Sequence, residues 1–414
     1  MNKKLIVIGG GAAGFFCAVN AASNNPNLKV LIVEKSGKLL SKVRVSGGGR
    51  CNVTHACFSI SEMIKKYPRG SKFLKQAFHH FFTTDTIQWF EERNVKLKTE
   101  EDGRMFPESN SSETIANCLL EEAKKNNVQI LLNRAVSKIE KISNGENEYH
   151  FRVSFADSST IIADFVCVAC GGFPKEIQYD WLRNLGHHFE APVPSLFTFN
   201  VPKNPISELM GISVNDVLVK IIGTNFSQQG PLLITHWGFS GPAILKLSAF
   251  AAKELAVLNY SFSISINWLN DYHENSALEK IRTIRNEIGA QKIVNRNPFG
   301  IPQRLWEYFL MQCDIDVDSR WADVAAKQQN QLAKVLCSQQ FTVKGKTTFK
   351  EEFVTAGGVS LNEVIPQSME SKLIPNLFFA GEILNVDGIT GGFNFQNAWT
   401  SGWLAAKEIK SRCD

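Results

Sequence analysis

Short apolar runs separated by turn-forming residues predict a buried parallel β-sheet at the start of the chain. Leu5–Ile8 and Leu28–Val33 are apolar at successive positions, which is typical of strands buried on both faces. Between them, small apolar residues predict a helix from about Ala12 to Ser23, which ends at Asn24-Asn25-Pro26. The segment is therefore predicted to form a strand–helix–strand unit.

Helical and strand patterns alternate through the next hundred or so residues. Residues 60 to 93 predict short helices, one of them capped by Thr84 or Asp85, and Asn110 to Glu113 resembles a capping box that opens a helix through Asn126. Asn144-Gly145 is a hairpin signal between two strands. The strands expected here are Gln129–Leu132, Val136–Ile142, Tyr149–Phe155 and Ile161–Ala169.

The pattern changes around Ala191-Pro-Val-Pro194. Residues 195 to 265 alternate in a β manner, and residues 277 to 338, including Trp321–Cys337, are mostly helical. Strands return from about Phe341, with Leu377–Ala380 as a buried strand before a final helix from Gln396 to Lys410. The β segments expected between the two changes are Leu196–Val201, Val217–Ile222, Leu232–Thr235 and Tyr260–Ile266.

These changes predict a nucleotide-binding domain formed by residues 1–190 and 341–414, interrupted by an inserted domain at residues 191–340. The β part of the insertion covers about 191–266 and its helical part about 270–338.

Composition is that of an ordinary globular protein. The 414 residues are 44% hydrophobic and 21% charged, and the net charge of +5 is too mild and dispersed to predict a nucleic-acid partner. No stretch approaches the ~20 apolar residues that a membrane span requires. Nine scattered cysteines suit reduced thiols, so we expect a cytoplasmic protein.

The segment from Gly9 to Gly14 matches G-x-G-x-x-G directly after the first strand, and Glu34 closes the second strand. Gly9 lets the chain turn, Gly11 lets a pyrophosphate approach the backbone, and Gly14 lets the helix lie close to the sheet. Glu34 is placed to accept hydrogen bonds from ribose hydroxyls. The pattern predicts binding of an adenine dinucleotide.

Three further segments favour FAD over NAD(P). The first is Ser46–Asn52, whose successive glycines expose backbone N–H groups, with Lys42 or Arg50 to offset pyrophosphate charge. The second is Ala169–Gly172, small residues at a strand end. The third runs from Phe379 to Gln396, where a carboxylate suits ribityl hydroxyls and a glycine pair brings a helix N-terminus to the flavin.

These segments resemble those of the aminoacetone-oxidase-like FAD-binding family, the BaiN-type NAD(P)/FAD-dependent oxidoreductases. Gly103–Pro107, Thr235–Ala243, Val354–Val359 and Met369–Lys372 match as well. The resemblance implies an α/β fold: a Rossmann-like FAD-binding domain of the glutathione-reductase type, interrupted by an inserted β-barrel-like plus helical domain.

The resemblance also implies a set of non-covalent FAD contacts, including a backbone contact from Val136 to adenine. Where many relatives have Ala-Thr-Gly, this chain has Ala169-Cys170-Gly171, and cysteine is the weaker donor. The implied contacts are Gly9, Gly11, Ala12, Ala13, Gly14, Glu34, Lys35, Lys42, Ser46, Gly47, Gly48, Gly49, Arg50, Asn52, Val136, Ala169, Gly171, Gly381, Glu382, Gly391, Gly392, Phe393 and Asn394.

Catalytic groups are less well marked. His236, at a strand end in the insertion, is the best candidate for proton transfer, although a structural role is also open. Arg104, after an Asp-Gly turn, would anchor an anionic substrate or bind a surface carboxylate. The two histidine pairs of the chain, His79-His80 and His187-His188, have no third ligand at a spacing that suits a metal ion. We therefore expect no metal site.

Two cysteine pairs are weak redox candidates. Cys51 and Cys57 form C-x5-C, whereas flavin-disulfide reductases use C-x4-C and carry a second nucleotide motif that is missing here. Cys167 and Cys170 lie three positions apart on a strand, so their side chains diverge. Both pairs are expected to be structural or incidental.

The predicted function is an FAD-dependent oxidoreductase that reduces an activated C=C bond in a small or steroid-like molecule. The chain has a single G-x-G-x-x-G, so NAD(P)H would visit transiently, or the substrate would be the reductant and dioxygen the acceptor, as in an amine oxidase. A flavin sensor and a flavin-dependent RNA-modifying or RNA-binding protein are further alternatives. The oligomeric state stays open. The RNA alternative predicts a basic stripe on the inserted domain, but Glu279 and Glu287 interrupt the positive charge there and no aromatic residues are interleaved. The basic residues in question are Lys280, Arg282, Arg285, Lys292, Arg296 and Arg304.

Overall fold

The computed structural model describes residues 3–143, 149–348 and 354–413, so the Asn144-Gly145 hairpin signal lies outside the described residues. The chain divides into two compact units. The terminal unit comprises Met1–Ser195 and Lys350–Asp414, and the inserted unit comprises Leu196–Phe349. The predicted boundary at 190/191 falls inside strand β11 (Phe189–Ser195) of the terminal unit. The predicted boundary at 340/341 falls inside strand β17 (Gln339–Lys344) of the inserted unit. Among the described residues, no helix is long and apolar enough to cross a membrane.

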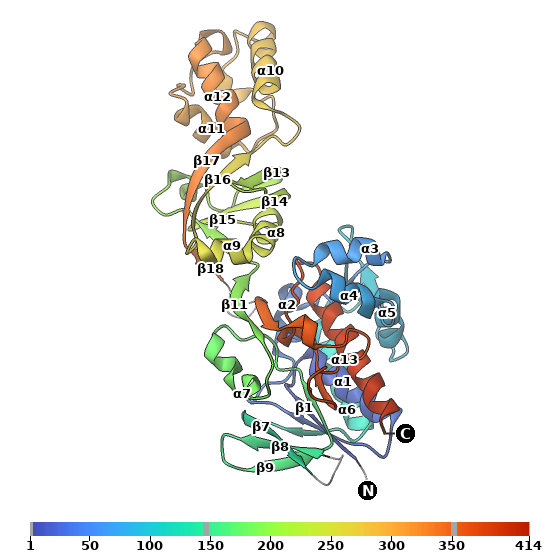
Figure 1. Cartoon of the computed structure of the whole chain (residues 1–414). Helices are drawn as coiled ribbons and strands as arrows, with labels where there is room; N and C mark the ends of the chain where they lie inside the picture. Colours follow the sequence, from blue (N-terminus) through green and yellow to red (C-terminus); the bar gives the residue numbers. More distant parts are fainter. Residues whose placement is uncertain (1–2, 144–148, 349–353, 414) are drawn as a thin grey trace. The chain divides into compact units, whose positions relative to one another are not determined.

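A parallel β-sheet in the order β20-β10-β1-β2-β6 forms the centre of the terminal unit (Figure 1). All neighbouring strands run parallel, and β1 and β10 are buried along almost their whole length, as the apolar runs predict. The strands are β20 (Leu377–Phe379), β10 (Phe165–Val168), β1 (Lys4–Ile8), β2 (Lys29–Val33) and β6 (Gln129–Leu131).

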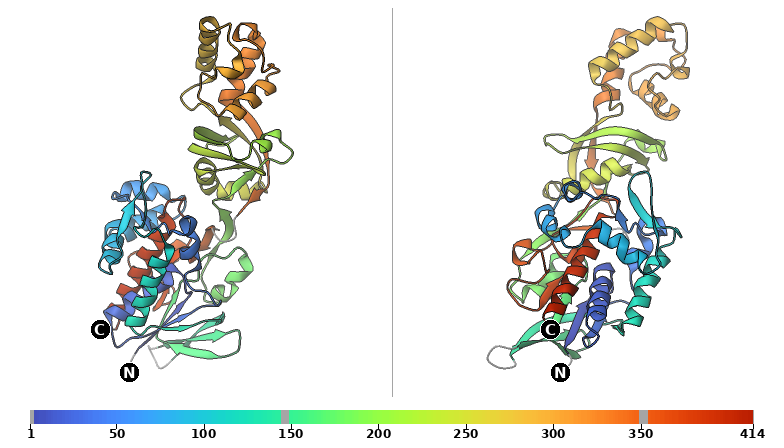
Figure 2. Two further views of the ribbon diagram at one scale, coloured as in Figure 1. Left: turned by 180° about the vertical axis from the view of Figure 1, so that it is seen from behind. Right: turned by 90° about the vertical axis from the view of Figure 1, so that its right-hand side faces the viewer.

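Helix α1 (Ala12–Asn24) packs along helix α13 (Phe393–Ser411), and Figure 2 shows the two side by side. Gly402 makes the approach possible, because a Cβ there would lie 2.7 Å from the carbonyl oxygen of Ala13. The other helices of the terminal unit are α2 (Ser41–Gly49), α3 (Ile60–Met63), α4 (Ser71–Phe78), α5 (Thr83–Glu91), α6 (Ser112–Lys125) and α7 (Asp180–Arg183).

The terminal unit contains further, antiparallel pairings. The predicted strand Ile161–Ala169 is in fact two strands, because β9 pairs with β8 whereas β10 joins the parallel sheet. These antiparallel strands are β3 (Thr54–His55), β4 (Leu97–Thr99), β5 (Arg104–Pro107), β7 (Val136–Ser143), β8 (Tyr149–Phe155), β9 (Thr160–Ala163), β11 (Phe189–Ser195) and β19 (Val354–Val359).

Two predicted helix caps are wrong. Helix α5 begins at Thr83, and Asp85 lies inside its first turn, where its Oδ2 accepts the N–H of Phe82 at 2.7 Å. Helix α6 begins at Ser112 and has Ser111 as its N-cap, without a side-chain cap. Glu113 is therefore one position short of the capping-box site, and it forms an ion pair with Arg44. In both cases the sequence pattern predicted the helix correctly but identified the wrong residue as its N-cap.

The inserted unit has an antiparallel sheet whose strands differ in length and follow the order β17-β16-β13-β14-β15-β12-β18. The two outer strands of this order, β17 and β18, are consecutive in the chain and separated by Gly345, whose φ is +88°. The strands are β12 (Thr198–Asn200), β13 (Ser213–Ile221), β14 (Ser227–Thr235), β15 (Gly238–Ser240), β16 (Ser261–Asn267), β17 (Gln339–Lys344) and β18 (Lys346–Thr347).

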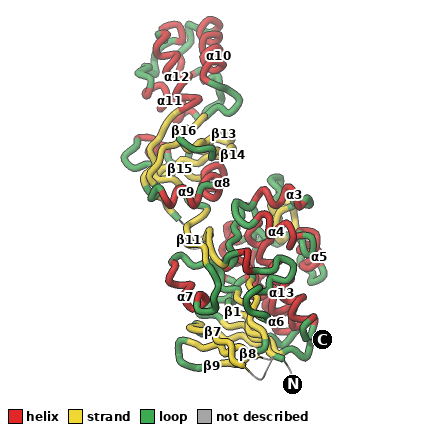
Figure 3. Tube along the Cα trace, in the orientation of Figure 1, coloured by secondary structure: helices red, strands yellow, loops and turns green. Residues whose placement is uncertain are grey.

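Three helices lie together beyond one end of these strands: α10 (Glu274–Glu287), α11 (Gln303–Gln312) and α12 (Ala326–Ser338). Figure 3 shows these helices in red and the strands in yellow. The predicted helix Trp321–Cys337 is broken after Asp323, so that only α12 is α-helical. Helix α8 (Pro242–Phe250) begins at a proline and is followed by α9 (Ala252–Val257). The inserted unit has its own core, including buried Trp268 and Trp306.

The contact at Gly402 generates a stability prediction. Gly402→Val should lower the free energy of unfolding by about 1–3 kcal/mol, because the new side chain meets the backbone of α1, which cannot move without disturbing the sheet. Chemical denaturation followed by circular dichroism measures the change.

Gly37→Val is the matched control, since a Cβ at Gly37 would meet only Asn133 Oδ1 at 3.5 Å. Equal stability of the two variants would contradict the packing role of Gly402.

Candidate cofactor site

The carboxyl ends of the parallel strands bring together segments that are far apart in sequence. Strand β1 leads into Gly9–Gly14, β2 into Glu34, β10 into Ala169–Gly172, and β20 into Ala380–Glu382. Because parallel strands end at one edge, all of these segments lie at the same edge of the sheet. This edge is where ligands bind in open α/β sheets.

The first glycine loop has the geometry expected from its spacing. Gly9 has a φ of +117°, and a Cβ there would lie 2.4 Å from the carbonyl oxygen of Ala169. A Cβ at Gly14 would lie 2.0 Å from the carbonyl oxygen of Gly9, so only glycine lets the helix start this close to the strand. A Cβ at Gly11, in contrast, would meet no atom within 4 Å. Gly11 therefore borders open space.

Helix α1 starts at this open space without a side-chain cap. Its N-cap is Gly11, and Ala12 and Ala13 form its first turn. The first N–H groups of a helix have no intrahelical acceptor, and the helix dipole adds positive charge at this end. Together the open space and the uncapped helix suit a pyrophosphate.

Glu34 holds the loop from the neighbouring strand. Its Oε2 accepts the Gly10 N–H at 2.8 Å, and its Oε1 accepts the Ser36 N–H at 2.9 Å and the Ser36 hydroxyl at 2.8 Å. A carboxylate oxygen has more than one acceptor site, so Oε2 keeps capacity for a hydroxyl. The adjacent Lys35 is exposed, with its ammonium 5.3 Å from the centre of the Phe173 ring.

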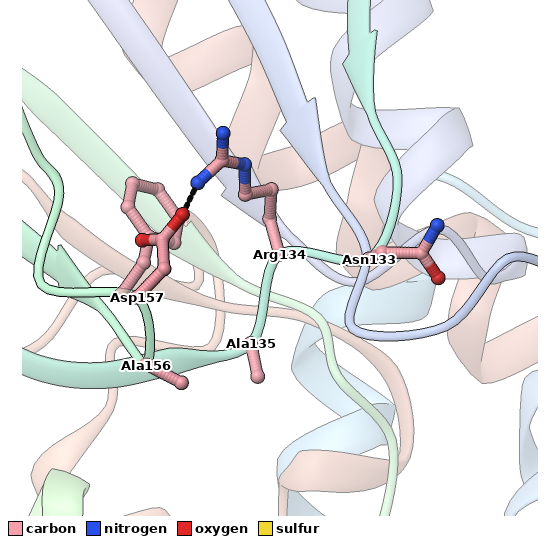
Figure 4. A pocket seen from close by; sticks show the side chains of 6 residues that line it. Asn133, Arg134, Ala135, Ala156 and Asp157 are labelled. Carbon is pink, nitrogen blue, oxygen red and sulfur yellow. Dashed lines mark ion pairs between the residues drawn. The ribbon is translucent and has the colours of Figure 1, made fainter.

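A pocket of about 320 Å³ opens beside the segment that follows Glu34. It lies where β7 begins and β8 ends. The Arg134 N–H donates to the Glu34 carbonyl at 2.8 Å, which ties the pocket to that segment. Figure 4 shows Arg134 turned toward Asp157, with which it forms an ion pair, and Asn133 pointing the other way. Val136, the expected adenine contact, is the first residue of β7 and pairs with the lining residue Phe155.

The second glycine segment is partly helical rather than a simple loop. Helix α2 contains a kink at Ser46, after which Gly47, Gly48 and Gly49 have φ values of +59°, +67° and +82°. Side chains at Gly48 and Gly49 would meet nothing within 4 Å. Three successive residues with positive φ form a left-handed turn, a conformation that glycine adopts readily and other residues rarely adopt.

The cations expected near this segment are paired with carboxylates. Arg50 binds Glu100 at 2.5 Å and stacks on Phe106 with 4.0 Å between guanidinium carbon and ring centre. Lys42 binds Glu382, the residue that follows β20, at 2.5 Å. The structure thus joins Lys42 and Glu382, two expected contacts separated by 340 residues.

Glu382 also receives a backbone N–H from β19. Its Oε1 accepts from Thr355 at 2.8 Å, and Gly172 lies so close to Thr355 that a Cβ would be 2.6 Å from the threonine Cβ. Gly171 has a φ of +77° and borders Glu382. The preceding Gly381 donates its N–H to Ser401 on α13 at 2.8 Å, which ties this strand end to the last helix.

The N-terminus of α13 lies beside β3. Gly392, with a φ of +91°, is its N-cap, and a Cβ there would lie 2.5 Å from the Thr54 carbonyl. The amide of Asn52, oriented to satisfy both groups, donates to the Thr54 carbonyl and accepts the Gly392 N–H at 3.0 Å each. Asn394 exchanges two hydrogen bonds with the backbone of Gly388.

His55 is a site residue that the sequence did not indicate. Its Nδ1 lies 3.1 Å from the Gly391 carbonyl, and its ring centre lies 4.7 Å from that of Phe393. Strand β3 is only two residues long, so no periodic pattern marks it. In that strand His55 pairs with Arg104 of β5.

Asp387 is a second residue of this region for which the sequence predicts no individual role. Its fully buried carboxylate forms an ion pair with Arg69 and accepts the Ser195 hydroxyl at 2.8 Å. Burial raises the pKa of Asp387, and the hydrogen bonds from Arg69 and Ser195 oppose that rise. The loop that leads to the Gly391–Gly392 pair is thereby fixed to two other segments.

The two expected catalytic side chains lie in different units. Arg104 belongs to the terminal unit, where it binds Asp102 at 2.7 Å and Glu100 at 3.3 Å. His236 belongs to the inserted unit, where it is exposed and its ring centre lies 4.1 Å from that of Trp237. The structure therefore pairs Arg104 with surface carboxylates, one of its two expected roles.

The cysteines are free thiols. All nine lie within the described residues, and none forms a disulfide. Burial raises the pKa of Cys51 and of Cys170 to about 12, so both are protonated at neutral pH. The expectation that these cysteines are structural or incidental stays a prediction.

Comparisons with known proteins identify the family of this chain. Residues 3–408 match the model of the HI0933-like protein Rossmann domain. The chain is 29% identical over 413 residues to the ribosomal RNA dihydrouridine synthase of Escherichia coli strain K12, covering 98% of this chain and 97% of that protein. It is 25% identical over 418 residues to the 3-dehydro-bile acid delta(4,6)-reductase of Clostridium scindens, covering 99% and 100%.

Among solved structures, the fold is similar to that of the open conformation of a flavocytochrome c3 fumarate reductase. The TM-score is 0.51 at 15% identity, covering 99% of this chain and 78% of that one. At this identity the likeness shows the fold alone.

The open space at Gly11 generates the second prediction. Gly11→Ala should fold normally, because its φ of −95° suits alanine and the Cβ meets no protein atom. It should weaken FAD binding at least about 10-fold, since the methyl group occupies the pyrophosphate space. Thermal unfolding of the apoprotein and FAD titration measure the two effects.

Gly9→Ala is the contrasting variant, because it should lower apoprotein stability itself. Unchanged FAD affinity in Gly11→Ala would contradict the proposed pyrophosphate position.

Proposed function

The chain belongs to the HI0933-like Rossmann family of FAD-dependent oxidoreductases, and from this we propose that it reduces an activated C=C bond with electrons from NAD(P)H. The observation that carries the proposal is the open, uncapped helix start at Gly11, at the edge where the five parallel strands end. Bound FAD supplies hydride chemistry, accepting two electrons from a reduced nicotinamide and passing them to an electron-poor carbon.

The residues present fit FAD. A Cβ placed at Gly11, Gly48 or Gly49 would meet no protein atom within 4 Å, so each of these glycines borders open space. The N-termini of helices α1 and α13 have no side-chain cap. We propose that Gly11 and the first turn of α1 hold the pyrophosphate, that Glu34 binds the adenosine ribose, and that Glu382 binds the ribityl chain. The other contacts that the resemblance implies would complete this set.

The start of α13 would hold the pyrimidine end of the flavin ring. The Gly391–Gly392 pair and the uncapped N–H groups of Phe393 and Asn394 offer positive dipole ends there. Negative charge that develops on a reduced flavin would be stabilised by this dipole. His55, Asn52 and Asp387 act on the same stretch by fixing its backbone.

The names of the relatives support reduction of a double bond. A bile acid delta(4,6)-reductase and a dihydrouridine synthase both saturate a C=C bond conjugated to a carbonyl group, although the molecules differ. In such a reaction a hydride adds to the β-carbon and a proton to the α-carbon. NAD(P)H is oxidised to NAD(P)⁺, and the substrate gains two hydrogens.

We propose that the inserted unit serves as the substrate domain and that its sheet closes as a barrel through β17 and β18. His236 is the candidate to deliver the proton to the α-carbon. Arg104 is the candidate to polarise or anchor the substrate, which would require it to exchange its contacts with Asp102 and Glu100. A small, steroid-like enone is the proposed substrate class.

Ribosomal RNA is a second candidate substrate, favoured by the names of the relatives at 29% identity. Several basic side chains of the helical part already bind groups of the inserted unit. Lys292 pairs with Asp318 at 2.6 Å, and Arg285 donates to the Ala322 carbonyl at 2.8 Å. Amine oxidation by dioxygen and flavin sensing are the remaining alternatives from the sequence.

The third prediction tests the reaction directly. The purified holoprotein should lose its oxidised-flavin absorbance when mixed anaerobically with NADH or NADPH, because electrons pass from nicotinamide to flavin. Addition of 4-androstene-3,17-dione, or of uridine-containing ribosomal RNA in a parallel sample, should restore the absorbance and yield the saturated product. Stopped-flow spectroscopy and mass spectrometry provide the readouts.

A protein that is bleached by neither nucleotide would overturn the proposal. Bleaching followed by reoxidation only with dioxygen, in the presence of amines, would favour the oxidase instead. The gain of two hydrogens in the RNA sample alone would identify RNA as the substrate.

A further inference from the structure

We propose that Arg69 and Asp387 are positioning residues for the flavin: their contacts fix the first turn of α13, and their two charges set the reduction potential of the bound cofactor. The inference rests on the proposed function only in placing the pyrimidine end of FAD at that turn. Both residues belong to the terminal unit.

The pair lies in the interior of the terminal unit. The side chain of Asp387 is fully buried, and that of Arg69 is 13% exposed. One carboxylate oxygen of Asp387 accepts from Nε of Arg69, and the other accepts from Nη2 of Arg69. The second oxygen also accepts the Ser195 hydroxyl at 2.8 Å. Three donors from two segments therefore hold the carboxylate in one orientation.

The segments that carry the pair contact the first turn of α13. Arg69 and Asp387 also meet through their backbones as an antiparallel bridge. Two residues before Arg69, the buried Tyr67 hydroxyl donates to the Phe393 carbonyl at 2.6 Å. One residue after Asp387, a Cβ at Gly388 would lie 2.8 Å from the Cβ of Phe393. A displacement of the pair would therefore displace the start of α13.

The electrostatic effect of the pair follows from its burial. Desolvation of two buried charges offsets much of their attraction, so such a pair adds little net stability. Each charge nevertheless acts on neighbouring groups, because the protein interior screens charges poorly. Reduction leaves negative charge on the flavin ring, whose electronics respond to charges beside it. A positive charge near the ring therefore favours reduction, and a negative charge opposes it.

The fourth prediction is that removal of one charge at a time shifts the flavin potential in opposite directions. Asp387→Asn removes the negative charge and should favour reduction, whereas Arg69→Gln removes the positive charge and should oppose it. Each substitution should change the equilibrium constant for two-electron reduction at least about threefold. Anaerobic titration of the holoprotein against a reference dye of known potential measures the change. Loss of packing alone would shift both variants in the same direction, toward the potential of free FAD.

The Glu370–Arg412 ion pair supplies the matched control. Glu370 is also buried, and Arg412 is the C-cap of α13, at the opposite end of that helix. Glu370→Gln and Arg412→Gln should leave the flavin potential unchanged, even where they lower stability.

Two further variants separate charge from contact. Ser195→Ala removes one hydrogen bond and keeps both charges, so it should change the potential less than either charge variant does. Arg69→Lys keeps the positive charge and loses the two-point contact with the carboxylate. Its potential should stay closer to that of the natural protein than the potential of Arg69→Gln, a comparison that holds even if Asp387→Asn folds poorly. Circular dichroism of each variant reports folding.

An unchanged potential in Arg69→Gln, or a shift of both charge variants in the same direction, would overturn the inference. These outcomes are distinct from failure of the proposed function, because the dye titration uses neither enone nor nicotinamide. Opposite shifts in a protein that reduces no enone would refute the reaction alone. Enone reduction with unchanged potentials would refute the role of the pair alone, and absence of bound FAD would overturn both.

Discussion

The approach of α1 to α13 is the constraint on which the rest of the terminal unit depends. Gly402 lets the backbones meet at Ala13, and Ser401, one residue earlier, holds the Gly381 N–H. A helix that begins at residue 12 is thereby placed against one that begins at residue 393. Each strand end that faces the candidate site is positioned relative to this helix pair.

The site is built mainly from backbone. Its glycines leave space, its two helix starts supply N–H groups, and its carboxylates are already bonded to the protein, as Glu34 is to Gly10 and Glu382 to Thr355. Such a site fixes one large cofactor firmly but says little about what reacts with it. Relatives that share almost the whole chain carry names that refer to molecules as different as a bile acid and ribosomal RNA.

Local sequence patterns predicted the parts of the fold that depend on local physics. The parallel strands, the first helix and the G-x-G-x-x-G turn are set by apolar runs and by glycine conformations, and the structure confirms them. The caps at Asp85 and Glu113 were wrong because each helix begins at a residue other than the one that the pattern marks. Asp85 lies inside α5, and Glu113 is one position short of the capping-box site of α6.

Long-range contacts explain what could not be predicted at the site. His55 lies on a two-residue strand, and its partner Gly391 is 336 residues away. The bonds of Asp387 to Arg69 and Ser195 likewise join residues that are 318 and 192 positions apart. No periodicity encodes such pairs, and the proposed contacts with FAD stay predictions.

The order of the polypeptide has a consequence for how the protein is made. Strand β20 and helix α13 leave the ribosome after the inserted unit, which has a hydrophobic core of its own. A nascent chain can therefore fold its middle before its outer parts meet. If FAD binds at the proposed contacts, its site would be incomplete until residues 377–411 have been synthesised, and cofactor binding would then follow synthesis of the rest of the chain.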